Sequence, residues 1–181
     1  MICDPSDPNW RTYMEARQGP LDPAVMTFLQ DVRRLVAPRL LQGSDYDRAM
    51  RADIQHRQFS GVDGPAFAVT WMALRGEREV APPYVIRVPT IIISNDIQLQ
   101  KDPMGLAGTL VHELGHAAAG INHGHDSYWR EVTNQMGLTV YSTADPIENY
   151  HQGWMWNPVV WQGIHDLPSF TPLVRSQMEP T

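Results

Sequence analysis

Cysteine is almost absent from this sequence of 181 residues, since Cys3 is the single one. One cysteine cannot form a disulfide within the chain, and it excludes zinc fingers and zinc ribbons, which need two or more cysteine ligands. A metal site in this chain therefore has to be built from histidine and carboxylate side chains.

Long hydrophobic runs and an excess of positive charge are also missing. No apolar run approaches the roughly 18 residues of a membrane-spanning helix. The opening residues MICDPSDPNW lack the basic and then apolar pattern of an export signal. We therefore expect a soluble, cytoplasmic protein without membrane contact. The formal net charge of −6 does not support binding to nucleic-acid phosphates.

The length predicts one domain over residues 1–181. We expect residues 1–20 to be irregular. The cap signal Asp22-Pro23 and a helical spacing of apolar residues predict a first helix up to Pro38. A similar spacing predicts a second helix over residues 44–58.

Short β-rich runs follow at residues 67–74, 84–88 and 90–94 and predict a small, mostly antiparallel sheet. Because proline has no backbone donor, Pro89 is expected at an edge strand or a bulge. The fold class is then α+β, with N-terminal helices, a small mixed or antiparallel sheet, and a later helix packed on that sheet.

That later helix has the strongest pattern in the chain. Asp102 and Pro103 form its start signal, and Gly120 is a natural stop. Its apolar stripe consists of Leu106, Leu110, Leu114, Ala117 and Ile121. A further helix is expected from about Asp126 to Gly137, with Trp129, Val132 and Met136 facing inward.

The segment VHELGHAAAG lies on the predicted helix and places His112 and His116 four residues apart. This spacing puts both imidazoles on one helix face, about one turn apart, as two ligands of a zinc ion require. Glu113 lies next to the first ligand, where a carboxylate can take a proton from a metal-activated water. The pattern predicts a Zn²⁺-dependent peptidase that hydrolyses peptide bonds in a protein or peptide, with Glu113 as general base.

A catalytic zinc ion usually has three protein ligands and an open position, so a third ligand is needed. We favour His125, which follows the turn after the motif helix. His123 and Glu131 remain alternatives.

The order of IIISNDIQLQ, a capped helix with HELGH, and HGHDSYW resembles the zinc-binding core of SprT-like metallopeptidases. The resemblance covers residues 84–137, about a third of the chain. It implies a zincin-like fold, with His112, His116 and His125 as zinc ligands and Glu113 as base. Members with a cysteine zinc ribbon or a DNA-binding region differ from this chain, which shows neither.

Two other functions are considered. Metzincins use HExxHxxGxxH and a methionine turn, and a protease of that type would use His123 as third ligand. Here, however, Gly120 and His123 lie one residue too late for the pattern. A non-catalytic, zinc-stabilised binding module would instead have a fourth protein ligand.

The last part of the chain, residues 141–181, is rich in aromatic residues and is expected to wrap around the catalytic unit. Simple core filling is the favoured role for these aromatics. A role for Tyr150 or His151 in oxyanion stabilisation is the alternative.

Overall fold

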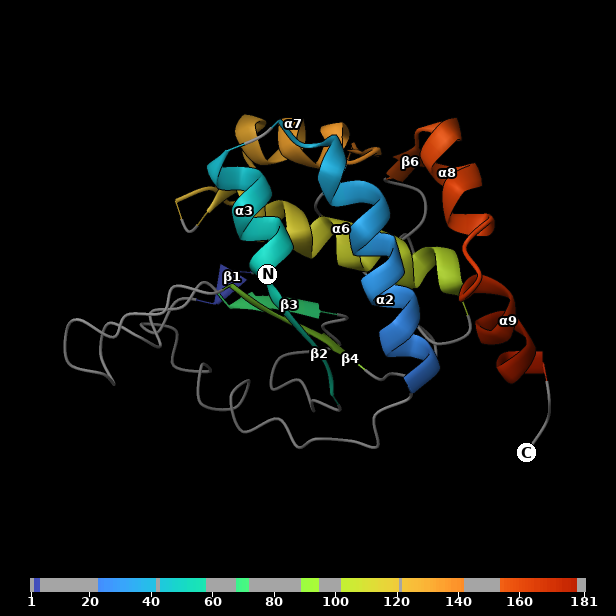
Figure 1. Cartoon of the computed structure of the whole chain (residues 1–181). Coiled ribbons are helices and arrows are strands. Elements are labelled where there is room, and N and C mark those ends of the chain that lie inside the picture. Colours follow the sequence, from blue (N-terminus) through green and yellow to red (C-terminus); the bar gives the residue numbers. More distant parts are fainter. Residues whose placement is uncertain are drawn as a thin grey trace.

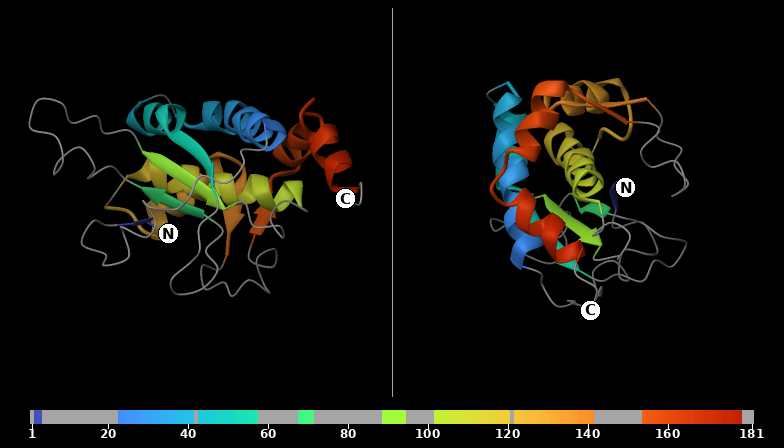
Figure 2. Two further views of the ribbon diagram at one scale, coloured as in Figure 1. Left: turned by 90° about the horizontal axis from the view of Figure 1, so that it is seen from below. Right: turned by 90° about the vertical axis from the view of Figure 1, so that its right-hand side faces the viewer.

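One central helix, α6 (Pro103–Ala119), organises the computed structural model of the chain (Figure 1). The structure describes residues 2–3, 23–41, 43–57, 68–71, 89–94, 102–120, 122–141 and 154–178. The sheet lies on one side of α6, and helices α2 (Pro23–Val36) and α3 (Ser44–Arg51) lie along another (Figures 1 and 2). Helix α7 (Ser127–Gln135) packs against α6 as well.

Local interactions at both ends explain where α6 begins and ends. The side chain of Asp102 accepts hydrogen bonds from the backbone N–H groups of Met104 and Gly105, at 3.0 and 3.1 Å. Gly120 ends the helix with a φ of 99°, a backbone conformation that favours glycine. Every residue of α6 except Met104 and His112 is buried. The predicted helix and its start and stop signals are therefore confirmed.

The larger sheet contains four described strands in the order β1, β3, β4, β2. These strands are β1 (Ile2–Cys3), β2 (Asp53–Arg57), β3 (Ala68–Trp71) and β4 (Thr90–Ser94). Only the pairing of β3 with β4 is antiparallel, and the other two pairings are parallel. The mixed sheet is confirmed, but the prediction that it is mostly antiparallel is wrong for these strands. The predicted strand at 84–88 lies outside the described residues.

Of the two places expected for Pro89, an edge strand or a bulge, the edge strand is wrong, and the bulge would involve residue 88, which lies outside the described residues. Strand β4 lies between β3 and β2, so it is an interior strand. Pro89 precedes the first residue of β4, and its carbonyl accepts a hydrogen bond from the backbone N–H of Asp53 at 2.8 Å. Because proline keeps its acceptor, it can begin an interior strand when no ladder donor is needed at that position.

The first predicted helix is confirmed as α2, which is followed by the short helix η1 (Ala37–Arg39). The second prediction, a helix over 44–58, is wrong in its second half. Helix α3 ends at Arg51, and Asp53–Arg57 form β2 in parallel register with β4. Ile54 is buried in β2, and an apolar residue at this position fits a helix as well as a strand, so helical spacing alone could not exclude a strand whose hydrogen-bond partners come from a distant segment.

The described residues after α6 form regular helices and strands, although the sequence suggested only that the last part of the chain wraps around the catalytic unit. Helix α7 begins after its cap Asp126, as predicted, and Gly137 follows it with a φ of 98°. Strands β5 (Leu138–Val140) and β6 (Trp154–Trp156) form an antiparallel pair, and helices α8 (Pro158–His165) and α9 (Phe170–Met178) follow. Of the residues expected to be irregular, 1–20, only Ile2–Cys3 are described, and they form β1.

Helices α2, α8 and α9 pack together beside α6. A single core cluster joins these helices with the sheet and α7. In the part of the chain that the structure describes, no helix combines the length and the apolar character needed to cross a membrane.

Candidate metal centre

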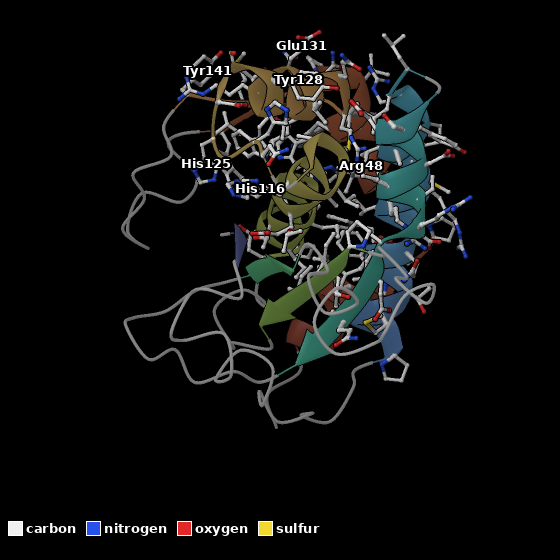
Figure 3. All side chains as sticks on the ribbon, turned by 90° about the vertical axis from the view of Figure 1, so that its left-hand side faces the viewer. Arg48, His116, His125, Tyr128, Glu131 and Tyr141 are labelled. Atoms are coloured by element: carbon white, nitrogen blue, oxygen red, sulfur yellow. The ribbon has the colours of Figure 1, made fainter. Side chains whose placement is uncertain are left out.

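Three histidine side chains point their Nε2 atoms toward one another at the edge of the central helix. His112 and His116 lie one turn apart on α6, and His125 lies in the loop just before the cap of α7. The Nε2 atom of His125 is 3.1 Å from the Nε2 atoms of both His112 and His116. Figure 3 shows the side chains of His116 and His125 beside each other. The structure therefore brings together the three histidines that the sequence favoured as ligands.

The chemistry of this donor set fits a metal ion. A neutral imidazole carries one N–H and one lone pair, so a single N–H at His125 cannot serve both neighbouring Nε2 atoms. A cation among the three rings would bind all three lone pairs at once. Zinc–nitrogen bonds of about 2.0–2.1 Å place neighbouring nitrogens of a tetrahedron about 3.3 Å apart. The observed 3.1 Å lies close to this spacing, so the three side chains could hold a metal ion.

The other two candidates for the third ligand are placed differently. The Nδ1 atom of His123 is 2.8 Å from a carboxylate oxygen of Asp126, and its ring packs against Tyr128 with centroids 4.7 Å apart. Glu131 is exposed on α7 and accepts a hydrogen bond from Gln135 at 3.4 Å. Figure 3 shows Glu131 pointing away from His116 and His125. Among the described residues, neither side chain joins the histidine cluster.

Trp129 supports all three histidines from the side of α7. Its ring centroid is 4.8 Å from that of His112, 5.0 Å from that of His116 and 4.6 Å from that of His125. Its indole N–H donates to the backbone carbonyl of His112 at 3.4 Å. The predicted inward orientation of Trp129 is confirmed, but the helical pattern gave no sign that it contacts the three imidazoles. This packing limits the rotation of the three rings.

Burial keeps the three imidazoles neutral in the metal-free protein. It lowers the pKa of His112 well below the usual 6.5 and lowers the pKa of His116 to about 2. The pKa of His125 is also lowered, mainly by burial. Metal ions bind the neutral form of imidazole, so the side chains are in the ligand form at neutral pH.

Glu113 is buried, with 2 % of its surface exposed, and contacts strand β3. The hydroxyl group of Thr70 lies 3.0 Å from the backbone carbonyl of Glu113 and also forms a hydrogen bond with its Oε2 atom. Sequence reasoning missed Thr70. It lies in the predicted strand 67–74, but its meeting with α6 depends on how the sheet packs against that helix.

The C-terminal segment contributes a side chain to the same region. The ring of Trp154 lies nearly parallel to that of His112, with centroids 6.0 Å apart and planes 29° apart. It also lies over Gly108, where an added Cβ atom would come within 2.3 Å of the indole ring. Trp154 packs against the core, as core filling predicts, and also lines the histidine cluster. Tyr150 and His151 lie outside the described residues.

Comparison of the sequence with models of known protein families, of the sequence with curated proteins, and of the structure with solved structures gives no match.

Proposed function

We propose that the chain is a zinc-dependent peptidase with a zincin-like fold, of the kind that the SprT-like motif implies. The observation that carries this proposal is the convergence of the Nε2 atoms of His112, His116 and His125, with Glu113 next to the first of them in the chain. The mixed α+β architecture, with the motif helix packed on the sheet, is consistent with it.

The donor set favours zinc over the common hard cations. Three neutral imidazoles suit zinc and other late transition metals, whereas Mg²⁺ and Ca²⁺ prefer oxygen ligands. The three described ligands leave room in a four-coordinate site for one more group, as in catalytic zinc sites.

Each residue has a distinct task in the proposed reaction. Zinc, when bound, lowers the pKa of a coordinated water to about 7 and polarises a carbonyl group. Glu113 accepts the proton of the attacking water and returns it to the leaving amine. Trp129 holds the three imidazoles in place. The substrate class that this arrangement supports is a protein or peptide, whereas the acidic net charge gives no support for a nucleic-acid partner.

A comparison of two glutamate variants tests the proposal. The purified protein should contain about one zinc ion per chain and should cleave an unfolded protein such as casein or a mixed peptide library. Glu113→Gln should keep the metal and lose at least about a hundredfold in cleavage rate, because it removes the base. Glu131→Gln is the matched control, since Glu131 is exposed on α7 and outside the cluster. Equal rates for Glu113→Gln and the unmodified protein would contradict the mechanism.

One observation favours a second candidate, a non-catalytic module stabilised by zinc. The buried Glu113 carboxyl group is hydrogen-bonded to Thr70, and such a bond would also suit a purely structural role. The cobalt-substituted protein separates the two functions. An open coordination position predicts that added azide changes the visible cobalt spectrum. A closed site with four protein ligands predicts an unchanged spectrum.

A further inference from the structure

A buried threonine on the sheet reaches the motif helix at the proposed base. Thr70 is fully buried in β3, and its hydroxyl contacts two atoms of Glu113, the backbone carbonyl oxygen at 3.0 Å and the carboxyl Oε2. Strand β3 packs against α6, so the contact joins the sheet to the helix that carries His112 and His116.

Among the buried threonines of the described chain, Thr70 differs from the others because it contacts a carboxyl group. Two other buried threonines, Thr109 and Thr133, meet that need by donating to backbone carbonyls one turn earlier in their own helices, at 2.9 and 3.2 Å. Thr70 also contacts a backbone carbonyl, but both of its partners belong to Glu113 on another element, and one of them is a carboxyl oxygen. A glutamate side chain has three rotatable bonds, and a hydrogen bond at Oε2 restricts how far the carboxyl group can turn.

We propose that Thr70 is a positioning residue for Glu113. Its hydroxyl fixes the Glu113 carboxyl group in one orientation, so that the base reaches its proton without rearrangement. The inference rests on the proposed function, since it assigns Thr70 a task in the same reaction. It adds a residue from the four-stranded sheet to a site whose other described members lie on α6, α7, the loop between them and β6.

Four variants test this assignment through kinetics. Thr70→Val removes the hydroxyl at nearly constant volume and should lower kcat at least tenfold, while KM and zinc affinity stay within about twofold. Thr70→Ser keeps the hydroxyl and should restore most of kcat. Thr109→Val is the matched control, because Thr109 is 3 % exposed on α6 and donates only to the carbonyl of Gly105. If Thr70→Val does not fold, Thr70→Ala and Thr70→Ser give the same comparison, since they differ by the hydroxyl alone.

A second measurement does not depend on peptidase activity. Thr70→Val and Glu113→Met are combined, and the melting temperatures of the metal-free proteins are compared in a double-mutant cycle. If the hydroxyl and carboxyl groups are coupled, the double variant should depart from the sum of the single variants by about 2 °C or more.

These outcomes separate the two proposals. A protein that binds zinc but cleaves nothing would contradict the proposed function, while the thermal cycle would still test the contact. A Thr70→Val variant with unchanged kcat, a Thr70→Ser variant as impaired as Thr70→Val, or additive melting temperatures would overturn the role of Thr70.

Discussion

Gly115 gives Trp129 the space to lie against the motif helix. A Cβ atom at position 115 would come within 2.8 Å of the indole Nε1 atom and within 2.3 Å of a methyl group of Thr133. Contacts this short do not occur between real side chains, so any larger residue at 115 requires the side chains of Trp129 and Thr133, or α7 itself, to shift. The glycine inside the motif HELGH is therefore explained by helix packing, and through Trp129 it affects all three histidines.

We predict that Gly115→Ala destabilises the protein by about 1–3 kcal/mol through overpacking. It should also weaken zinc binding about 10–100-fold, because Trp129 can no longer hold the imidazoles in place. Urea unfolding and competition with a zinc-binding dye measure these two effects. Gly124→Ala, in the loop beside His125, is the control, because a Cβ atom there meets nothing within 4 Å. Equal zinc affinities of the two variants would show that Trp129 does not support the ligands.

The helices around the site could be predicted from the sequence because their signals are local. Asp102, Pro103 and Gly120 mark the limits of α6, and Asp126 marks the start of α7. Such caps depend on neighbouring residues alone, so a short stretch of sequence contains all the information needed. The proposed ligand pair His112 and His116 is equally local, since its spacing on a helix fixes its geometry.

The sequence did not predict features that depend on residues far away in the chain. The apolar position of Ile54 is compatible with both a helix and a strand. In the structure it lies in a strand, because its segment pairs in parallel with β4, where Ile91 is its partner. Pro89 lies at the start of an interior strand because β2 supplies a donor to its carbonyl. The contact of Thr70 with Glu113 likewise depends on how β3 packs against α6, which no spacing pattern contains.

The choice between the two histidine candidates for the third ligand, His125 and His123, can be tested directly. His125→Ala should weaken zinc binding by more than about a hundredfold, since loss of a ligand costs more than loss of a supporting residue. His123→Ala is the matched control, because His123 is engaged with Asp126 and Tyr128 in the same loop. Isothermal titration with Zn²⁺ measures both affinities. A larger loss for His123→Ala would restore the metzincin-like arrangement.

A small polar network connects α3 to the C-terminal end of α6 and to α7. The Nε atom of Arg48 donates to the backbone carbonyl of Ala118 at 2.7 Å, and its guanidinium group forms an ion pair with Asp45 at 2.7 Å. The hydroxyl of Tyr128 donates to the other oxygen of the Asp45 carboxylate. Arg48 and Tyr128 are both labelled in Figure 3. The positive charge of Arg48 also interacts favourably with the negative, C-terminal end of the α6 dipole.

We therefore predict that Arg48→Met lowers the free energy of unfolding by about 1–2 kcal/mol, because it leaves the Ala118 carbonyl without its charged donor. Arg34→Met is a matched control. Arg34, in the last turn of α2, also pairs with an aspartate three residues earlier, Asp31, at 3.0 Å, but its side chain is 68 % exposed and its hydrogen bond to Asp31 is not accompanied by one to a backbone carbonyl among the described residues. Its loss should cost less than about 0.5 kcal/mol. Similar losses for both variants would reduce the role of Arg48 to a surface ion pair.

The lowered pKa values of His112 and His116 predict how the stability of the metal-free protein changes with pH. Burial holds the pKa of His112 well below 6.5 and that of His116 at about 2, whereas both return to about 6.5 in the unfolded chain. Below pH 6.5 the unfolded state then binds more protons than the folded state, so stability decreases as the pH falls. The folded-state pKa of about 2 for His116 predicts a loss of about 1.6 kcal/mol between pH 6.5 and pH 5, and His112 changes the stability in the same direction. Urea unfolding in the presence of a chelator measures this slope. His112→Asn should reduce it, because asparagine does not titrate, and an unchanged slope would show that the imidazole of His112 is not buried in its neutral form.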